Sequence, residues 1–170
     1  MRTITTPDLV LEPQVAAHAE EMFLVLGDPA IYEYENEPPA SLEWLRERFT
    51  RLETRRSGDG VELWLNWALR LTSGELIGFV QASVFPDGRA DIAYVLASRY
   101  WGRGLAHRAV TTMIGELAGY YGVRSLSAVL KRPNHRSQRL LERLGFTVAT
   151  PELRAGRRVA PDELLMHREV

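Results

Sequence analysis

Apolar residues recur along the chain at two spacings, which predict a mixture of helices and strands. Spacings of three and four positions, typical of a helix with one buried face, predict helices over Val15–Leu26, Ser41 to about Arg55, Leu105–Tyr120 and Asn134–Leu144. Alternating or short apolar runs between turn residues predict strands over Thr3–Leu11, Glu62–Leu71, Leu76–Phe85, Arg89–Leu96, Arg124–Leu130, Phe146–Ala149 and Glu163–Arg168. This order indicates an α+β (mixed α/β) fold with residues 1–170 in a single domain.

Composition narrows the possible functions. A net charge of −1 gives no reason to expect nucleic acid or an anionic membrane as a partner. The absence of cysteine excludes disulfides, thiolate metal sites and a cysteine nucleophile, and the four histidines show no metal-ligand spacing. The N-terminus has no apolar signal core, and no apolar run is long enough to span a bilayer. We therefore expect a cytoplasmic protein without a metal site.

A glycine-rich stretch between a predicted strand and a predicted helix indicates a phosphate-bearing ligand. It reads Arg99-Tyr100-Trp101-Gly102-Arg103-Gly104-Leu105-Ala106, and we call residues Arg99–Ala106 the glycine turn. Two glycines at the start of a helix expose several backbone N–H groups in one direction, and the helix dipole adds positive potential there. Because glycine has no Cβ, a bulky anion can approach the backbone closely.

Two common phosphate-binding motifs do not fit this stretch. A dinucleotide-binding loop requires a third glycine at position 107, where the chain has His107, and that loop follows the first strand of its fold rather than one at mid-chain. A P-loop requires Gly-Lys-Ser or Gly-Lys-Thr, which the chain lacks.

A second motif follows the strand predicted at 124–130. Asn134 stands where a helix N-cap belongs, Ser137 lies one turn later on the same face, and Gly145 ends the apolar pattern before Phe146. A capped amphipathic helix explains these residues without any ligand.

Together the two motifs resemble the GNAT superfamily of N-acetyltransferases. Arg99–Gly104 is similar to that family's loop for the pyrophosphate of acetyl-CoA, and Asn134–Phe146 is similar to its later Asn-x-x-Ser…Leu-Gly-Phe segment. His18–Glu21 and Asp28-Pro29 resemble the branch of RimJ and RimL ribosomal-protein acetyltransferases. The resemblance implies a mostly antiparallel sheet of about six to seven strands flanked by about four helices, with acetyl-CoA as co-substrate.

The resemblance also assigns residues to acetyl-CoA. Backbone N–H groups of the glycine turn would hold the pyrophosphate, through Arg99, Trp101, Gly102, Arg103, Gly104, Leu105 and Ala106. Val95 and Leu96 would pair with the pantetheine amides as a short added strand. Asn134 would hydrogen-bond the pantetheine arm, and Ser137 would lie near the thioester sulfur.

Acetyl transfer to an amine requires a neutral amine and benefits from a proton donor for the leaving thiolate. We expect Asp91 to act as general base, directly or through water, although a polar residue at the start of a strand after Gly88 explains it equally well. Ser137, or a water that it holds, is the expected acid. Some GNAT branches have a tyrosine where this chain has Leu141, so Tyr94 and Tyr100 are the alternative donors.

Acceptor binding is expected in two places. Glu33 and Glu35, with Glu37, lie among aromatic residues and could attract a cationic amine, although a solvated acidic loop is the simpler interpretation. Trp64 and Asn66 could line the pocket.

The expected function is acetyl transfer from acetyl-CoA to a primary amine, either a protein N-terminus or a small-molecule amine, by direct attack in a ternary complex. The alternatives are a non-catalytic CoA-binding regulatory module and a transferase that uses another acyl-CoA such as succinyl-CoA. A homodimer would be in keeping with the family.

Overall fold

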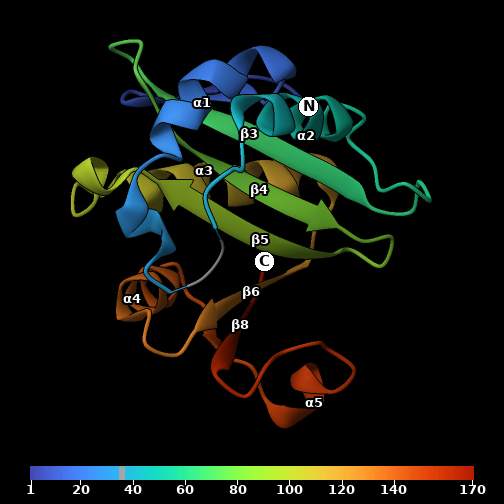
Figure 1. Ribbon diagram of the computed structural model, residues 1–170. Helices are drawn as coiled ribbons and strands as arrows, with labels where there is room; N and C mark the ends of the chain where they lie inside the picture. The colour runs from blue at the N-terminus through green and yellow to red at the C-terminus, as the bar shows by residue number, and fades with distance from the viewer. Residues whose placement is uncertain (35–36) are drawn as a thin grey trace.

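One twisted sheet forms the centre of the molecule, which we describe from a computed structural model over residues 1–34 and 37–170. Over these residues eight strands pair in the order β1-β2-β3-β4-β5-β6-β8-β7 (Figure 1). The strands are β1 (Ile4–Thr5), β2 (Leu9–Pro13), β3 (Leu63–Leu71), β4 (Leu76–Val84), β5 (Arg89–Leu96), β6 (Ser125–Lys131), β7 (Thr147–Val148) and β8 (Glu163–Glu169).

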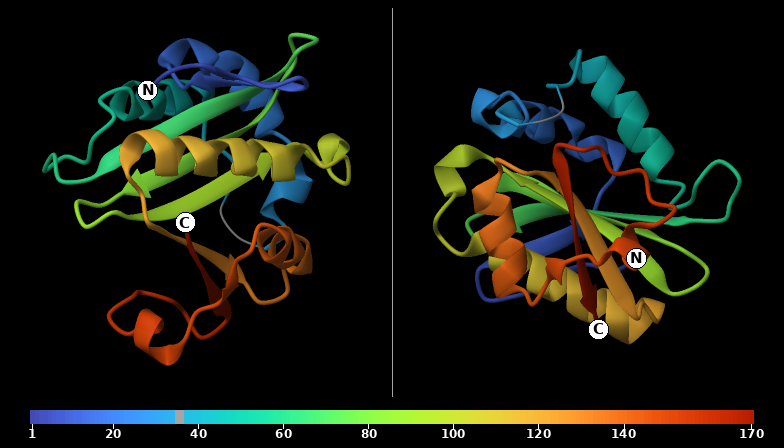
Figure 2. Two further views of the ribbon diagram at one scale, coloured as in Figure 1. Left: turned by 180° about the vertical axis from the view of Figure 1, so that it is seen from behind. Right: turned by 90° about the horizontal axis from the view of Figure 1, so that it is seen from below.

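Helices cover both faces of this sheet. The α-helices are α1 (Ala19–Val25), α2 (Leu42–Leu52), α3 (Leu105–Tyr121), α4 (His135–Arg143) and α5 (Pro151–Arg154), and the 3-10 turns are η1 (Ala16–His18), η2 (Pro29–Tyr32) and η3 (Ser98–Tyr100). Helices α1 and α2 lie on one face and α3 lies on the other (Figure 2). Leu65, Trp67 and Leu69 are therefore buried, but so are Asn66 and Ala68 on the opposite face of the same strand.

The sheet opens between its two parallel strands. All other strand pairs are antiparallel, whereas β5 and β6 run parallel and pair only over Arg89–Asp91 and Ser125–Ser127. Beyond these residues β6 and its neighbour β8 turn away from β5 (Figure 1). The remaining part of β5, up to Leu96, keeps β4 on one side and has an open edge on the other.

The predicted fold class is confirmed, with local differences. The strand predicted at 3–11 is two strands, β1 and β2, joined by a tight turn in which Thr6 N–H donates to the Leu9 carbonyl at 2.8 Å. The helix predicted at 15–26 begins with the 3-10 turn η1. Helix α5 was not predicted, because a four-residue helix is too short to show a hydrophobic period; Thr150 caps it.

Candidate functional site

The glycine turn has the backbone conformation that its sequence predicts. Gly102 and Gly104 adopt φ values of 76° and 73°, in the left-handed region that favours glycine, and Gly104 is the N-cap of α3. The turn is fixed at its start, because the Trp101 indole N–H donates to the Leu96 carbonyl at 2.8 Å and the Tyr100 side chain is buried.

The backbone N–H groups from position 102 to position 107 are available to a ligand. Among the residues that the structure describes, none of them donates a hydrogen bond within the protein, whereas Trp101 N–H and Arg108 N–H donate to Ser98 and Gly104. Six consecutive N–H donors at the start of a 17-residue helix form a site suited to phosphate oxygens.

A cavity of about 950 Å³ runs from the glycine turn across the sheet to helix α2. Its first part, near the glycine turn, is lined by Ile92–Leu96, Trp101, Gly102, Gly104–Arg108, Ala128–Leu130, Asn134, Arg136 and Ser137. Its second part, under η2 and α2, is lined by Gln14, Ala30–Tyr32, Tyr34, Glu37, Trp44, Leu45, Arg48, Phe49, Leu52, Asn66, Phe79 and Gln81. The open edge of β5 lies between the two parts, so one ligand on each side would meet there.

Helix α4 brings a hydroxyl pair to this meeting point. The Asn134 side chain caps α4 by accepting a hydrogen bond from Ser137 N–H at 3.1 Å. The Ser137 hydroxyl then lies 2.7 Å from the hydroxyl of Tyr94 on β5. Burial raises the pKa of Tyr94 to about 12, so this phenol stays protonated at neutral pH.

A cation–π contact joins α4 to the glycine turn. The Arg136 guanidinium lies 3.7 Å from the centre of the Trp101 ring. The two motifs found in the sequence, at 99–106 and 134–146, are therefore in direct contact.

A family comparison fits this geometry. Residues 8–147 match the model of the acetyltransferase (GNAT) domain. The chain belongs to the GNAT acetyltransferase family. Solved structures of ribosomal-protein acetyltransferases share its fold.

Three solved structures illustrate this likeness. Ribosomal-protein-S5-alanine acetyltransferase from Vibrio fischeri is 17% identical with a TM-score of 0.80, and the match covers 99% of this chain and 97% of that one. RimL, the ribosomal L7/L12 α-N-protein acetyltransferase in complex with coenzyme A, is 16% identical with a TM-score of 0.81 and coverage of 99% and 98%. A putative GNAT-family acetyltransferase from Bordetella pertussis is 24% identical with a TM-score of 0.76 and coverage of 99% of both chains. A search of curated protein sequences gave no match.

Most residues that the resemblance assigns to acetyl-CoA line the first part of the cavity of this acetyltransferase. Val95, Leu96, Trp101, Asn134 and Ser137 all do so, as do Gly102 and Gly104–Ala106. The side chains of Arg99 and Arg103 instead contact the Tyr100 ring, and Arg99 forms an ion pair with Glu75 at 3.0 Å.

The expected base, Asp91, lies beside the cavity rather than on its wall. It stands at the last position where β5 pairs with β6, and its carboxylate forms an ion pair with Arg157 from the loop before β8. Its side chain is 42% exposed. The role of Asp91 as a base stays a prediction.

Only some of the residues expected to bind the acceptor line the cavity. Asn66 and Glu37 line the second part of the cavity, whereas Glu33 is exposed and does not. Trp64 does not line it either, since its indole N–H donates to the Glu62 carboxylate at 3.0 Å. Glu35 lies outside the described residues.

Sequence reasoning missed two residues of the second part, Gln14 and Gln81. Each is a lone polar residue beside or within an apolar strand, and only the strand register places both next to Asn66.

The structure adds two findings about other possible ligands. Over residues 1–34 and 37–170, no group of three or more His, Cys, Asp or Glu side chains is arranged to hold a metal ion. In the same residues no helix has the length and apolar character needed to cross a membrane.

Proposed function

We propose that this protein transfers an acetyl group from acetyl-CoA to a primary amine by direct attack in a ternary complex. The observation that carries the proposal is the single cavity, which joins the glycine turn to the recess under α2 and passes the Tyr94–Ser137 pair on the way. A donor and an acceptor bound at its two ends would meet beside these hydroxyls.

The residues present fit acetyl-CoA. Unpaired N–H groups at positions 102–107 suit its pyrophosphate, and the open edge of β5 at Ala93–Leu96 suits the amides of its pantetheine arm. The side-chain oxygen of Asn134 (Oδ1) accepts the hydrogen bond that caps α4. The NH2 group of the same side chain therefore remains to donate to the pantetheine arm. When bound, acetyl-CoA supplies the activated acetyl group as a thioester.

The reaction forms one C–N bond at the amine and breaks the C–S bond of the thioester. The amine loses one proton, and the departing thiolate gains one. The hydroxyl pair of Tyr94 and Ser137 is the proposed donor to the sulfur, because the phenol remains protonated and its partner completes a short hydrogen bond. The chain has no cysteine, in keeping with direct attack by the amine.

Release of free CoA thiol in the presence of amines tests this proposal. The wild-type chain contributes no thiol background to an Ellman-type assay because it contains no cysteine. The expected result is acetyl-CoA- and amine-dependent thiol release, with the acetylated amine detected by mass spectrometry. CoA binding by calorimetry without release for peptides, polyamines, amino acids or aminoglycosides would instead indicate a regulatory CoA-binding module. Competition between acetyl-CoA and succinyl-CoA decides the donor.

A further inference from the structure

The second part of the cavity, which we call the recess, has Gln14 at one edge of its floor. The chain leaves β2 at Gln14, whose N–H donates to the Asn66 carbonyl at 2.9 Å and so extends the pairing of β2 with β3 by one residue. Both residues are buried, with exposed fractions of 2% and 4%, and both line the recess. The position of the Gln14 backbone therefore fixes this edge of the floor.

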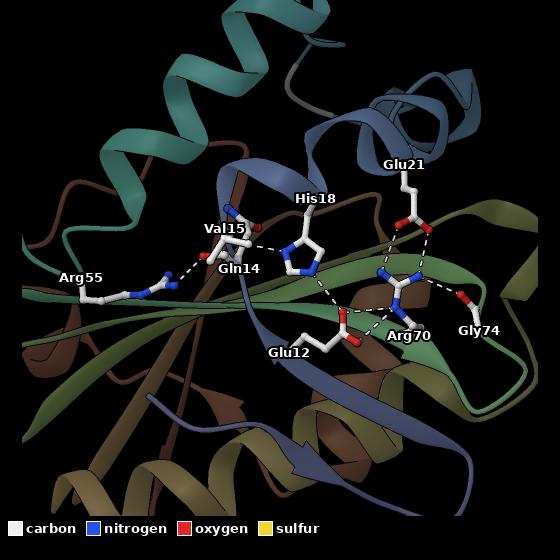
Figure 3. Close-up of polar contacts among 8 residues, drawn as sticks. All are labelled: Glu12, Gln14, Val15, His18, Glu21, Arg55, Arg70 and Gly74. Atoms are coloured by element: carbon white, nitrogen blue, oxygen red, sulfur yellow. Dashed lines mark hydrogen bonds and ion pairs between the residues drawn. The ribbon is translucent and has the colours of Figure 1, made fainter.

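Side chains hold the backbone at this exit from β2 on two sides (Figure 3). On one side, the Arg55 guanidinium donates a hydrogen bond to the Gln14 carbonyl. On the other, Val15 N–H donates to Nδ1 of His18 at 3.1 Å, and Nε2 of this ring lies 3.0 Å from the Glu12 carboxylate. Buried backbone groups need such partners where no strand pairing continues, so these side chains determine where the exit lies.

Arg55 links this floor to helix α2. Leu52 is the last residue of α2 and lines the recess, and Arg55 stands three positions after it. The guanidinium that bonds the Gln14 carbonyl also donates to the Leu52 carbonyl at 3.4 Å. Beside it, the Glu53 carboxylate accepts a hydrogen bond from Ala16 N–H. The end of α2 is thereby held at a fixed spacing from the exit of β2.

The backbone of Arg55 indicates that its side chain has a specific role. Among residues 1–34 and 37–170, it is the one non-glycine residue with a positive φ, 59°. Helices often end on glycine in this left-handed conformation, because a Cβ makes it costly for other residues. Glycine could make the same turn, in which the N–H of residue 55 donates to Leu52 and its carbonyl accepts from Trp64. The strain is compensated by what glycine lacks, the hydrogen bond from the guanidinium to Gln14.

Helix α1 is tied to the sheet by a different arginine. Arg70 of β3 pairs with Glu21 of α1 at 2.8 Å (Figure 3). A surface ion pair joins α2 to α1 but does not reach the sheet. Among the described residues, the polar contacts from the end of α2 to the exit of β2 are those of Arg55 and Glu53, and the one from Arg55 goes to a residue that lines the recess.

We infer that Arg55 is a positioning residue that sets the width of the recess between α2 and the floor at Gln14, and so limits the size of the amine that can enter. This inference rests on the proposed function, in which the recess receives the acceptor. Arg55 does not itself line the recess. Without its guanidinium, the Gln14 carbonyl loses a partner and the last turn of α2 is free to move away from the sheet.

The width of the recess can be measured without turnover, because the chain has no cysteine. Gln81→Cys places a single thiol on the floor, since Gln81 lines the recess and is paired with Asn66. Methyl methanethiosulfonate is a small thiol reagent, and fluorescein maleimide is a bulky one. The rate at which each reagent modifies this thiol, followed by mass spectrometry, shows which sizes can enter.

Two substitutions remove the guanidinium without opposing the turn. Glycine and asparagine both tolerate a left-handed φ, so Arg55→Gly and Arg55→Asn should keep the fold. In the Gln81→Cys background, we expect each to speed modification by fluorescein maleimide several-fold, with little change for methyl methanethiosulfonate. Arg55→Lys keeps a cationic donor and should restore most of the slow rate, a rescue that a general effect on stability would not produce. CoA affinity by calorimetry should be unchanged, because the glycine turn lies at the other end of the cavity.

Arg56→Asn is the matched control, because Arg56 is the next residue, is exposed, and donates to the Gly60 carbonyl at 3.3 Å outside the cavity. It should leave both rates unchanged. The inference is overturned if Arg55→Gly and Arg55→Asn leave the rate of fluorescein maleimide unchanged, if they speed both reagents equally, or if Arg56→Asn has the same effect. Failure of the proposed function looks different, since then CoA does not bind or no amine supports thiol release, and neither outcome alters the labelling rates.

Discussion

The glycine turn and a row of three carboxamide side chains, those of Gln14, Asn66 and Gln81, occupy the two ends of one cavity and are built in different ways. We call these three residues the amide row. In the glycine turn, the site consists of backbone N–H groups, and left-handed Gly102 and Gly104 set their direction. In the amide row, the site consists of side chains from β3, β4 and the end of β2, and the strand register brings them together.

The contrast between a backbone site and a side-chain site bears on which features many sequences can share and which depend on a single sequence. A site made of backbone needs only a few glycines and a helix start, so many sequences can form it. A site made of side chains changes with each substitution in the row. The end proposed to bind the donor therefore needs few specific side chains, whereas the end proposed to bind the acceptor depends on the side chains of this chain.

The largest expected effect comes from placing a side chain in the glycine turn. In Gly104→Glu, a Cβ would lie 3.2 Å from Arg108 Nη1, at a φ of 73° that costs a non-glycine residue about 1–2 kcal/mol. The added carboxylate also repels the pyrophosphate. Since tenfold in affinity is about 1.4 kcal/mol, we expect CoA affinity by calorimetry to fall by at least about a hundredfold.

Gly119→Glu is the control for this substitution. Gly119 lies on the exposed side of the same helix, and nothing lies within 4 Å of a Cβ built there. CoA affinity should be unchanged. Equal affinities of Gly104→Glu and wild type would show that the phosphate binds elsewhere.

The next largest effect is expected where the two ends meet. Tyr94→Phe removes the phenol from the hydroxyl pair, and we expect kcat to fall about tenfold to a hundredfold with little change in KM for acetyl-CoA. Because burial raises the pKa of Tyr94 to about 12, its titration should not appear in the wild-type rate–pH profile below about pH 11.

Ser137→Ala removes the other hydroxyl of the pair and should also lower kcat. Tyr120→Phe, on an exposed part of α3, should leave kcat unchanged; a loss equal to that of Tyr94→Phe would exclude a specific role for the pair.

The same difference explains what could be predicted from the sequence. The glycine turn and the cap at Asn134 depend on local backbone preferences, so short motifs identify them, and the structure confirms the cap with Ser137 N–H as its donor. The contact between Tyr94 and Ser137 joins residues 43 positions apart and requires the sheet to open between β5 and β6. No local pattern encodes that opening.

The amide row was less visible still. The alternation of Leu65, Trp67 and Leu69 identifies one buried face of β3, and Asn66 on the other face was expected to line the pocket, whereas no sequence pattern marked Gln14 or Gln81. Helices α1 and α2 cover that second face. Only this tertiary cover turns a polar strand position into the floor of a cavity.

A third prediction concerns Asp28, whose carboxylate links the segment before η2 to η3. Asp28, before η2, accepts hydrogen bonds from Ser98 N–H at 2.6 Å and Ala30 N–H at 3.1 Å, so it joins the acceptor side to η3 at the start of the glycine turn. Burial raises the pKa of Asp28, but the hydrogen bonds from Ser98 and Ala30 outweigh it and leave the pKa below the ordinary 3.8. Asp28→Ala is expected to lower the free energy of unfolding by about 1 kcal/mol at pH 7 in urea titrations.

The sign of the pH effect follows from the lowered pKa. The stabilisation by Asp28 is fully present above pH 3.8 and is lost as the pH falls below it through the folded-state pKa. Asp28→Asn keeps a side-chain acceptor and cannot titrate, so it should retain most of the stability and show a flatter pH dependence below pH 3.8. Identical pH dependences of wild type and Asp28→Asn would rule out this contribution.

The smallest expected effect concerns Asp91, which lies beside the cavity, and it distinguishes a chemical from a structural role for the Asp91 carboxylate. If its carboxylate accepts the amine proton through water, Asp91→Asn should lower kcat/KM only several-fold. The loss should be confined to pH values below about 8, where the amine most needs deprotonation. Arg157→Gln leaves that carboxylate unpaired and should preserve the pH dependence of wild type. If Asp91 serves only to hold the loop before β8, both variants should lower the melting temperature similarly, by a small amount because the pair is partly exposed, and neither should change the pH–rate profile.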